Sequence, residues 1–291
     1  MQHFLVAESE TADEREQRRD RAGKSAGETY AATLKQIRPN ATITIVAPSD
    51  ESARQLETGE LRAFDAVFIS GSPLHVYDDV PEVRRQIGFM RNVFASGTPA
   101  FGSCAGLQLA VAAAGGTVRK MPAWMEAGIA RGITATAAGR AHPLLAGRPA
   151  SWDAPSIHGD EVAILPAGAI ILATNAATAV QAAEIRYDGG VFWGVQYHPE
   201  LALGEIAVAL RGQSADLIDA GLAEAECDVE ARAAQLEALH DDPERRSLWW
   251  ALGVDSQFAD EKLRRTELAN FLSWIDAASD SRQGLCVVRA G

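Results

Sequence analysis

The first candidate for chemistry is a cysteine between two glycines, in the stretch Gly102-Ser103-Cys104-Ala105-Gly106. This Gly-x-nucleophile-x-Gly spacing is typical of a sharp turn from a strand into a helix, because bulky neighbours would keep strand and helix apart. At the helix N-terminus, unsatisfied N–H groups and the dipole favour a thiolate. The spacing predicts a nucleophile. The alternative is a buried structural cysteine, and the spacing alone does not fix the reaction, since the same turn with serine is typical of α/β-hydrolases.

A histidine and a glutamate stand two residues apart, in His198-Pro199-Glu200, directly after an apolar stretch that reads as a strand. Residues i and i+2 of an extended chain point the same way, so Glu200 can hold one imidazole nitrogen while the other faces a thiol. Alone, a histidine at a strand end is more often structural. At the same carboxyl edge of a sheet as Cys104, the pair predicts the base and orienting group that an activated cysteine needs.

A third stretch, Ser70-Gly71-Ser72-Pro73, again follows an apolar run and consists of small residues. Acyl transfer needs N–H donors aimed at the developing oxyanion. We expect one donor to be the backbone N–H of Ala105, directly after the nucleophile, and the other to come from Gly71 or Ser72. A Gly-Ser-Pro turn is also a commonplace loop.

These stretches lie in a sequence that alternates short apolar runs with helical segments, which favours a parallel sheet covered by helices. We expect helices over residues 80–96 and 107–114, and short strands and loops over residues 117–150. The mixed-sign charges of residues 13–21 could form a ligand-binding patch, but helical spacing favours a solvated helix face within residues 11–37. Strands are expected at residues 3–7, 42–46, 66–70, 99–102, 169–174, 182–187 and 191–196.

From residue 205 to residue 277 the sequence changes character, because alanine, leucine, glutamate and arginine dominate and helical periodicity takes over. Pro243 and Gly253 should divide this extension into three or four helices. Residues 278–291 are expected to be loose, with a possible short strand at residues 285–288. The neighbouring Trp249 and Trp250 could cap a pocket or meet a partner, but anchoring to the core is the favoured interpretation.

The bulk composition excludes several classes of function. A formal net charge of -12 argues against nucleic-acid binding, which needs a basic surface. Three widely spaced cysteines predict neither a disulfide framework nor a metal knuckle, and they fit a reducing cytoplasm. The first ten residues lack a signal pattern, and no apolar run is long enough for a membrane helix. We therefore expect a cytoplasmic protein. The sequence shows no metal-ligand cluster and no cofactor motif, and a thiolate, an imidazole and an oxyanion hole suffice for acyl transfer, so we expect no metal or cofactor.

Taken together, the motifs resemble the class I (triad-type) glutamine amidotransferases, most closely the branch similar to the amidotransferase domain of GMP synthase. The resemblance implies an α/β fold of three layers with an open, mostly parallel, flavodoxin-like sheet. It divides the chain into a catalytic domain of residues 1–204, a helical insertion of residues 205–263, a closing helix of residues 264–277 and a tail of residues 278–291. The stretches that carry it are Ser70-Gly71-Ser72-Pro73 with Val76-Tyr77-Asp78-Asp79, Gly102 to Gln108, Ser156 to Val162, and Gly194 to Glu200.

The resemblance also implies roles for individual residues. Cys104 would attack the γ-carboxamide of glutamine or a γ-glutamyl amide, His198 would protonate the departing amine, and Glu200 would orient His198. Gln108, Ser72 and Tyr197 would bind substrate, although Gln108 could equally be a surface residue. His158 and Asp160 match a motif near the site, where a structural loop role is favoured.

Two departures from the family pattern leave the leaving group open. Ala105 is smaller than the residue usual after the nucleophile, and about 60 residues intervene between His-Pro-Glu and the final helix. The chain could be a subunit that passes ammonia to a separate synthase, a free-standing hydrolase of γ-glutamyl amides, or, as the least favoured alternative, an inactive regulatory subunit. An oligomer is possible in each case.

Overall fold

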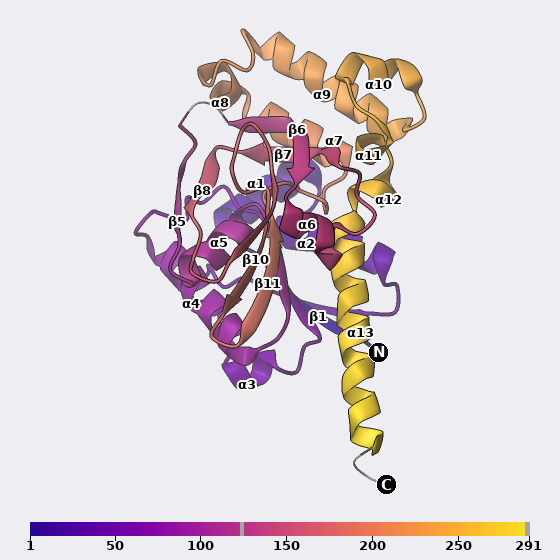
Figure 1. Ribbon diagram of the computed structural model, residues 1–291. Helices are drawn as coiled ribbons and strands as arrows, with labels where there is room; N and C mark the ends of the chain where they lie inside the picture. Colours follow the sequence, from indigo (N-terminus) through magenta and orange to yellow (C-terminus); the bar gives the residue numbers. More distant parts are fainter. Residues whose placement is uncertain (123–124, 289–291) are drawn as a thin grey trace.

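The computed structural model describes residues 1–122 and 125–288, and for residues 279–288 it describes the backbone alone. Most strands within these residues belong to one central sheet (Figure 1). In chain order its strands are β1 (His3–Ala7), β2 (Thr42–Val46), β3 (Ala66–Ile69), β4 (Ala100–Ser103), β6 (Glu126–Ala135), β7 (Ser151–His158), β9 (Ile170–Thr174), β10 (Ala182–Tyr187) and β11 (Gly190–Val195). A separate antiparallel pair joins β5 (Thr117–Lys120) to β8 (Asp160–Ile164).

The order of strands in the central sheet is β2-β1-β3-β4-β11-β10-β9-β6-β7. The first five run parallel, and the remaining strands are antiparallel to their neighbours. The seven strands expected from the sequence are confirmed, each within one residue of its predicted bounds. The ten-residue strand β6 is longer than the short strands expected there. Because β4 pairs directly with β11, the sheet brings the segments of Cys104 and His198 side by side at one carboxyl edge.

Helices cover both faces of the sheet and bury a separate core on each. One face packs against α2 (Ala26–Ile37) and α13 (Thr266–Val288), where Phe68 meets Phe271 edge to face at 5.6 Å. The other face packs against α3 (Thr58–Leu61), α4 (Pro81–Ser96) and α5 (Ala105–Ala113). The three-layer α/β class is thus confirmed. The short helices α6 (Ala137–Ala141) and η1 (Pro143–Leu145) lie between β6 and β7 in the chain.

The charged segment near the N-terminus forms two helices, α1 (Ala12–Ala22) and α2. Each begins with a capping box, and Gly23 separates them in the left-handed conformation at φ 75°. The prediction of a solvated face is wrong for part of α1. Arg15 is buried and donates to Asp50 across 2.6 Å, and other residues of this helix line a cavity.

The helical character of residues 205–277 is confirmed, but the described residues divide it into more pieces than the three or four predicted. In order they are α7 (Leu203–Gly212), α8 (Ser214–Asp219), α9 (Glu226–Asp241), α10 (Arg246–Leu252), α11 (Ser256–Ala259), α12 (Glu261–Arg264) and α13. Helices α7 to α11 pack around a third core, which reaches the sheet at Ile129 of β6, whereas α13 packs in the core that it shares with α2. In Figure 1, α8, α9 and α10 form a cap at the opposite end of the molecule from the end of α13.

Two local predictions for this region need correction. Helix α13 continues to Val288, so residues 278–288 are neither a loose tail nor a strand at residues 285–288; residues 289–291 of the predicted tail lie outside the described residues. The two tryptophans also differ. Trp249 packs against the third core and donates to the Pro243 carbonyl, whereas Trp250 is 88% exposed and anchors nothing. No helix among the described residues is long and apolar enough to cross a membrane.

Candidate active site

Cys104 occupies a strained turn between β4 and α5. Its backbone lies at φ 53° and ψ -111°, a conformation rarely adopted by residues other than glycine. The two glycines allow this turn to pack closely: a Cβ on Gly106 would stand 2.5 Å from the Ile69 carbonyl oxygen, and one on Gly102 would stand 3.0 Å from the Gly106 carbonyl carbon. The Cys104 N–H donates to the Val195 carbonyl across 2.8 Å. This hydrogen bond joins the turn at Cys104 to β11, the strand that leads to His198.

His198 and Glu200 form a buried pair beside this elbow. The ring Nδ1 and the carboxylate Oε1 are 2.7 Å apart, and both residues are almost fully buried. Burial lowers the pKa of His198, but Glu200 and Cys104 outweigh it and raise the pKa to about 10. The ring Nε2 makes no hydrogen bond to any described residue. An imidazolium held at Nδ1 with a free Nε2 can give a proton to a ligand next to Cys104.

Gly71 lies against both catalytic candidates. A Cβ added there would stand 2.9 Å from His198 Cε1 and 3.7 Å from Cys104 Cβ, so only glycine leaves the space between these side chains open. Ser72 follows, and its hydroxyl accepts the Leu74 N–H. Ala105 is buried and begins α5, where backbone N–H groups lack helical partners. These backbone positions flank Cys104 as an oxyanion hole requires.

A cavity of about 910 Å³ opens above Cys104. Of the residues predicted for the site, Cys104, His198, Glu200, Gly71, Ser72 and Gln108 line it. Ala105 does not line it with its side chain. The prediction that Tyr197 binds substrate is wrong, because the ring is fully buried away from the cavity and its hydroxyl donates to Glu267 of α13 across 2.8 Å.

We call one part of the cavity the β8 side, defined by Gln108, Met121, Met125, His158 and Asp160. Gln108 is buried, and its amide donates to the Asp160 carbonyl and the Gln196 side chain, both at 3.2 Å. It is therefore not a surface residue. Both ring nitrogens of His158 are engaged, one with the Asp160 carbonyl and the other with the buried carboxylate of Glu126. These contacts are consistent with the structural role expected for His158.

The Asp160 carboxylate makes hydrogen bonds to the loop that carries Ser72. His75 Nδ1 lies 2.6 Å from it, the Tyr77 hydroxyl donates to it across 3.1 Å, and the two rings stack on each other. Sequence reasoning did not single out His75. The stretches on either side of His75 carry part of the family resemblance, but its contact with Asp160 joins residues 85 positions apart and could not be read from local sequence.

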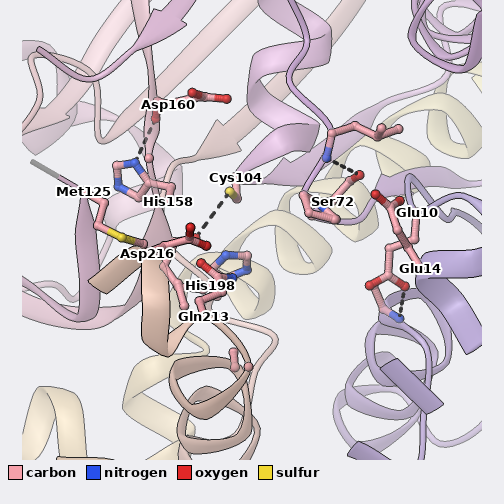
Figure 2. A pocket seen from close by; sticks show the side chains of 18 of the residues that line it. Glu10, Glu14, Ser72, Cys104, Met125, His158, Asp160, His198, Gln213 and Asp216 are labelled. Carbon is pink, nitrogen blue, oxygen red and sulfur yellow. Dashed lines mark hydrogen bonds between the residues drawn. The ribbon is translucent and has the colours of Figure 1, made fainter. Parts of the chain in front are cut away.

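We call the other part of the cavity the α1–α7 side, defined by Glu10, Glu14, Arg18, Glu205 and Ala209. Figure 2 shows Glu10 and Glu14 on the side of Ser72, with Met125, His158 and Asp216 on the other side of Cys104. Burial raises the pKa of Glu10 to about 7, despite its hydrogen bond from the Ala26 N–H and its proximity to Arg18. Sequence analysis did not single out Glu10, and for the charges of residues 13–21 it favoured a solvated helix face over the alternative of a ligand-binding patch. One signal was present, since Glu10 follows the apolar strand β1 at the carboxyl edge of the sheet.

The family model described as glutamine amidotransferase class-I matches residues 22–211. A protein of Pseudomonas sp named gamma-glutamyl-L-1-hydroxyisopropylamide hydrolase is 38% identical over 221 residues, which are 75% of this chain and 74% of the relative. A glutamine-hydrolyzing GMP synthase of Leifsonia xyli subsp. xyli is 34% identical over 140 residues, 48% of this chain and 26% of the synthase. The chain thus spans about a quarter of that synthase.

The fold is also similar to that of solved proteins. A glutamine amidotransferase of Thermotoga maritima superposes with a TM-score of 0.64 at 14% identity, and the match covers 94% of this chain and 97% of that chain. At this identity the likeness concerns the fold. The flavodoxin-like architecture and the sequence similarity agree on one family.

Proposed function

Because the chain belongs to the class I glutamine amidotransferases, we propose that it is a free-standing γ-glutamyl amide hydrolase in which Cys104, His198 and Glu200 perform the cleavage. The broader activity follows from the family and from the hydrolase relative. The chain is an amidohydrolase that acts on the γ-amide of glutamine or of a γ-glutamyl conjugate. The proposal concerns the catalytic residues and the choice of the leaving amine.

In the proposed first step, the Cys104 sulfur attacks the γ-carbonyl carbon and the carbonyl electron pair moves to oxygen. The N–H of Ala105 and that of Gly71 or Ser72 stabilise the oxyanion. The His198 imidazolium gives its Nε2 proton to the amide nitrogen, the C–N bond breaks, and the amine leaves a γ-glutamyl thioester. Glu200 keeps the ring oriented through Nδ1.

In the second step, water attacks the thioester carbon while the neutral Nε2 of His198 takes one of its protons. Collapse of the tetrahedral intermediate expels the Cys104 thiolate and releases glutamate, whose new carboxyl loses its proton to solvent. The thiolate and imidazolium are restored. Gln108 and Ser72 are proposed to contact the γ-glutamyl part, Gln108 from the β8 side of the cavity.

The observation that carries the choice of amine is the cavity itself. Its volume of about 910 Å³ is near the upper end of the roughly 300–1,000 Å³ common for ligand sites, far more than glutamine requires. The cavity extends from Cys104 past Ser72 to Glu10 and Glu14 of the α1–α7 side (Figure 2). Space there supports a leaving amine larger than ammonia. The Pseudomonas relative, named for an amide of such an amine, supports the same choice.

A second candidate is a glutaminase that passes ammonia to a separate synthase subunit, and the similarity to GMP synthases favours it. For either candidate we propose a cytoplasmic location. The free thiols of Cys104 and Cys227 support a reducing compartment.

A substrate panel tests the proposal. The purified chain is assayed alone with glutamine and with γ-glutamyl amides of methylamine, ethylamine and propylamine, and glutamate release is measured for each. The hydrolase proposal expects kcat/KM to be higher for the alkyl amides than for glutamine. A preference for glutamine, with turnover only in the presence of a second protein, would support the synthase-subunit alternative instead.

A further inference from the structure

The loop that carries one expected oxyanion donor has no backbone ladder to hold it. We call residues 71–77 the oxyanion loop; they lie between β3 and α4 and belong to neither a helix nor a strand. The first two of them, Gly71 and Ser72, line the cavity together with Cys104. An oxyanion donor accelerates acyl transfer only when it is held in position before the reaction. Because the proposed function includes an oxyanion at Cys104, it requires contacts that hold this loop.

Ser70 fixes the orientation of the first peptide unit of the loop. Its buried hydroxyl accepts the Ser9 N–H and donates to the Gly71 carbonyl, both across 3.0 Å. The peptide bonds of the described residues are trans, so the Ser72 N–H points away from the Gly71 carbonyl. This N–H makes no hydrogen bond to any described residue, and it can donate to a ligand. Ser70 thus orients the donor, but it does not contact the rest of the loop.

The other end of the loop is attached to Asp160 by two side chains. His75 Nδ1 lies 2.6 Å from one carboxylate oxygen, and because an ionised carboxylate only accepts, this nitrogen carries the proton. The Tyr77 hydroxyl donates to the other oxygen across 3.1 Å. Burial and the negative charge of Asp160 raise the pKa of Tyr77 to about 12, so the hydroxyl remains a donor at neutral pH. The His75 side chain is 51% exposed and Tyr77 is 44% exposed, so packing contributes little to holding them.

Asp160 is itself firmly anchored. It is the first residue of β8, and it pairs with Lys120 of β5 in an antiparallel ladder. Its carboxylate is mostly buried, and its backbone carbonyl accepts from the Gln108 amide across 3.2 Å. Asp160 therefore joins the oxyanion loop to the residue proposed to contact the γ-glutamyl part. In Figure 2, Ser72 and Asp160 lie on different sides of Cys104, so these contacts connect the two sides of the nucleophile.

The partners of Asp160 are not those that stability alone would require. A buried carboxylate needs hydrogen bonds to offset its lost hydration, but partners within β5 or β8 would serve that purpose. Here the partners are half-exposed side chains, three and five positions after Ser72. Resting on the proposed function, we propose that Asp160 is a positioning residue for the oxyanion hole. Its carboxylate holds the oxyanion loop through His75 and Tyr77, so that the Ser72 N–H stays in place.

Loss of these contacts should lower kcat rather than raise KM, because the oxyanion forms during the reaction and is absent from the bound substrate. Removal of one oxyanion donor typically lowers kcat by about 10²–10³-fold. A displaced donor keeps part of its effect, so we expect His75→Ala and Asp160→Ala each to lower kcat by about 10–100-fold. KM should stay within about threefold of the wild type, because both variants keep the Asp160 carbonyl that contacts Gln108.

Steady-state kinetics of single and double variants test the proposal, with glutamine and γ-glutamyl ethylamide as substrates. An oxyanion forms with either substrate, so each variant should lower kcat by the same factor for both. Because His75 acts through Asp160, the double variant His75→Ala/Asp160→Ala should lose no more than about threefold beyond Asp160→Ala alone. His75→Asn keeps an N–H donor for the carboxylate, and its kcat should lie within about fivefold of the wild type.

His142→Ala is the matched control, since His142 makes the same type of contact away from the cavity. Its ring Nε2 lies 3.1 Å from the buried carboxylate of Glu184, and neither residue lines the cavity. The variant should lose stability but keep kcat within about twofold of the wild type. Thermal unfolding checks every variant. Because His75 is half exposed, His75→Ala and His75→Asn should fold even if Asp160→Ala does not, and the comparison of these two then decides the proposal.

The outcomes separate this role from the proposed function. If Cys104→Ala is inactive but folded His75→Ala and Asp160→Ala keep kcat within about twofold, the positioning role is wrong and the proposed cleavage stands. A raised KM at unchanged kcat would also overturn the role, because the contacts would then serve substrate binding alone. Effects that multiply in the double variant would mean that His75 acts independently of Asp160, which contradicts the proposal. A wild-type preference for glutamine would contradict the proposed choice of amine, while the kcat factors measured with glutamine would still decide the role of Asp160.

Discussion

The two sides of the cavity differ in what holds their residues in place. Cys104 follows β4 and His198 follows β11, two neighbouring parallel strands joined by backbone hydrogen bonds with Ser103 opposite Val195. Glu10 precedes α1, whereas Arg18 and Ala209 stand on two helices from distant parts of the chain. These helices meet through side chains, such as Arg21 lying over Gly212.

This difference separates the chemistry from the selection of the amine. A ladder of backbone hydrogen bonds fixes the distance between nucleophile and base whatever the neighbouring side chains are. Helix surfaces can exchange side chains without disturbing such a ladder. We therefore expect substitutions on the strand ends to reduce kcat for every substrate, and substitutions on the α1–α7 side to change mainly the ratio between substrates.

The largest effect should come from Cys104→Ala. Without the sulfur no thioester can form, and we expect turnover of glutamine and of all γ-glutamyl amides to fall by about 10⁴-fold or more. Glutamate release in a coupled assay measures it, and thermal unfolding checks that the variant is folded. Equal losses for all substrates would support the view that the strand ends govern the chemistry and not the choice of substrate. Activity within tenfold of the wild type would exclude Cys104 as the nucleophile.

The catalytic residues at the strand ends could be predicted because the patterns that indicate them lie within short stretches of sequence. The turn around Cys104 needs glycine at both flanking positions, and the structure shows the backbone contacts that require it. The spacing of His198 and Glu200 correctly predicted that they pair, although Pro199 and Glu200 lie in a turn, with the Leu201 N–H donating to the His198 carbonyl across 3.4 Å, rather than in an extended chain. Buried parallel strands also read as continuous apolar runs, which is why their bounds could be predicted closely.

The α1–α7 side of the cavity could not be predicted because its contacts join segments that are distant in the chain. Arg18 stands in a run of mixed charges that reads as a solvated face, and only the packing of α7 against α1 turns this surface toward a cavity. Tyr197 illustrates a different limit. Motif similarity suggested contact with substrate, but the Tyr197 ring is fully buried and its hydroxyl donates to Glu267 of α13. The extent of α13 was also underestimated, because polar and glycine residues interrupt its apolar pattern.

A smaller effect is expected from Glu200→Gln, which tests how Glu200 controls the pKa of His198. The glutamine keeps the side-chain length but removes the negative charge that raises the pKa of His198 to about 10. Burial then dominates and lowers this pKa, so the imidazolium needed for the leaving amine is lost at lower pH. We expect kcat at pH 8 to fall by about 10²–10⁴-fold, within the range of general acid–base catalysis. The alkaline limb of the kcat profile should move to lower pH.

A matched His–Glu pair controls for this experiment. Glu126 lies 3.0 Å from His158 on the β8 side and is similarly buried. Glu126→Gln should leave the alkaline limb where it is in the wild type, even if the variant is less stable. An unchanged limb in Glu200→Gln would mean that another group supplies the proton.

The smallest of these effects concerns a buried ion pair that joins the strand end to the helices. Arg148 and Glu267 are 2.7 Å apart with side chains almost fully buried, and Glu267 also accepts from Tyr197, the neighbour of His198. The same guanidinium donates to Gln257 of α11 and to the Arg264 carbonyl of α12. Glu267→Gln should lower the free energy of unfolding by about 3–5 kcal/mol, because the arginine is left buried without its anion.

Urea unfolding measures this loss, with Glu230→Gln as the control. Glu230 pairs with Arg211 on the surface, so its loss should cost at most about 1 kcal/mol. If Glu267→Gln also lowered kcat for glutamine and amides alike, the helices would support the position of His198 and the separation of the two sides would be incomplete. Unchanged kcat in the folded variant would mean that the β4–β11 ladder holds the catalytic residues without help from the helices. An unfolding free energy within 1 kcal/mol of the wild type would contradict the importance assigned to this buried pair.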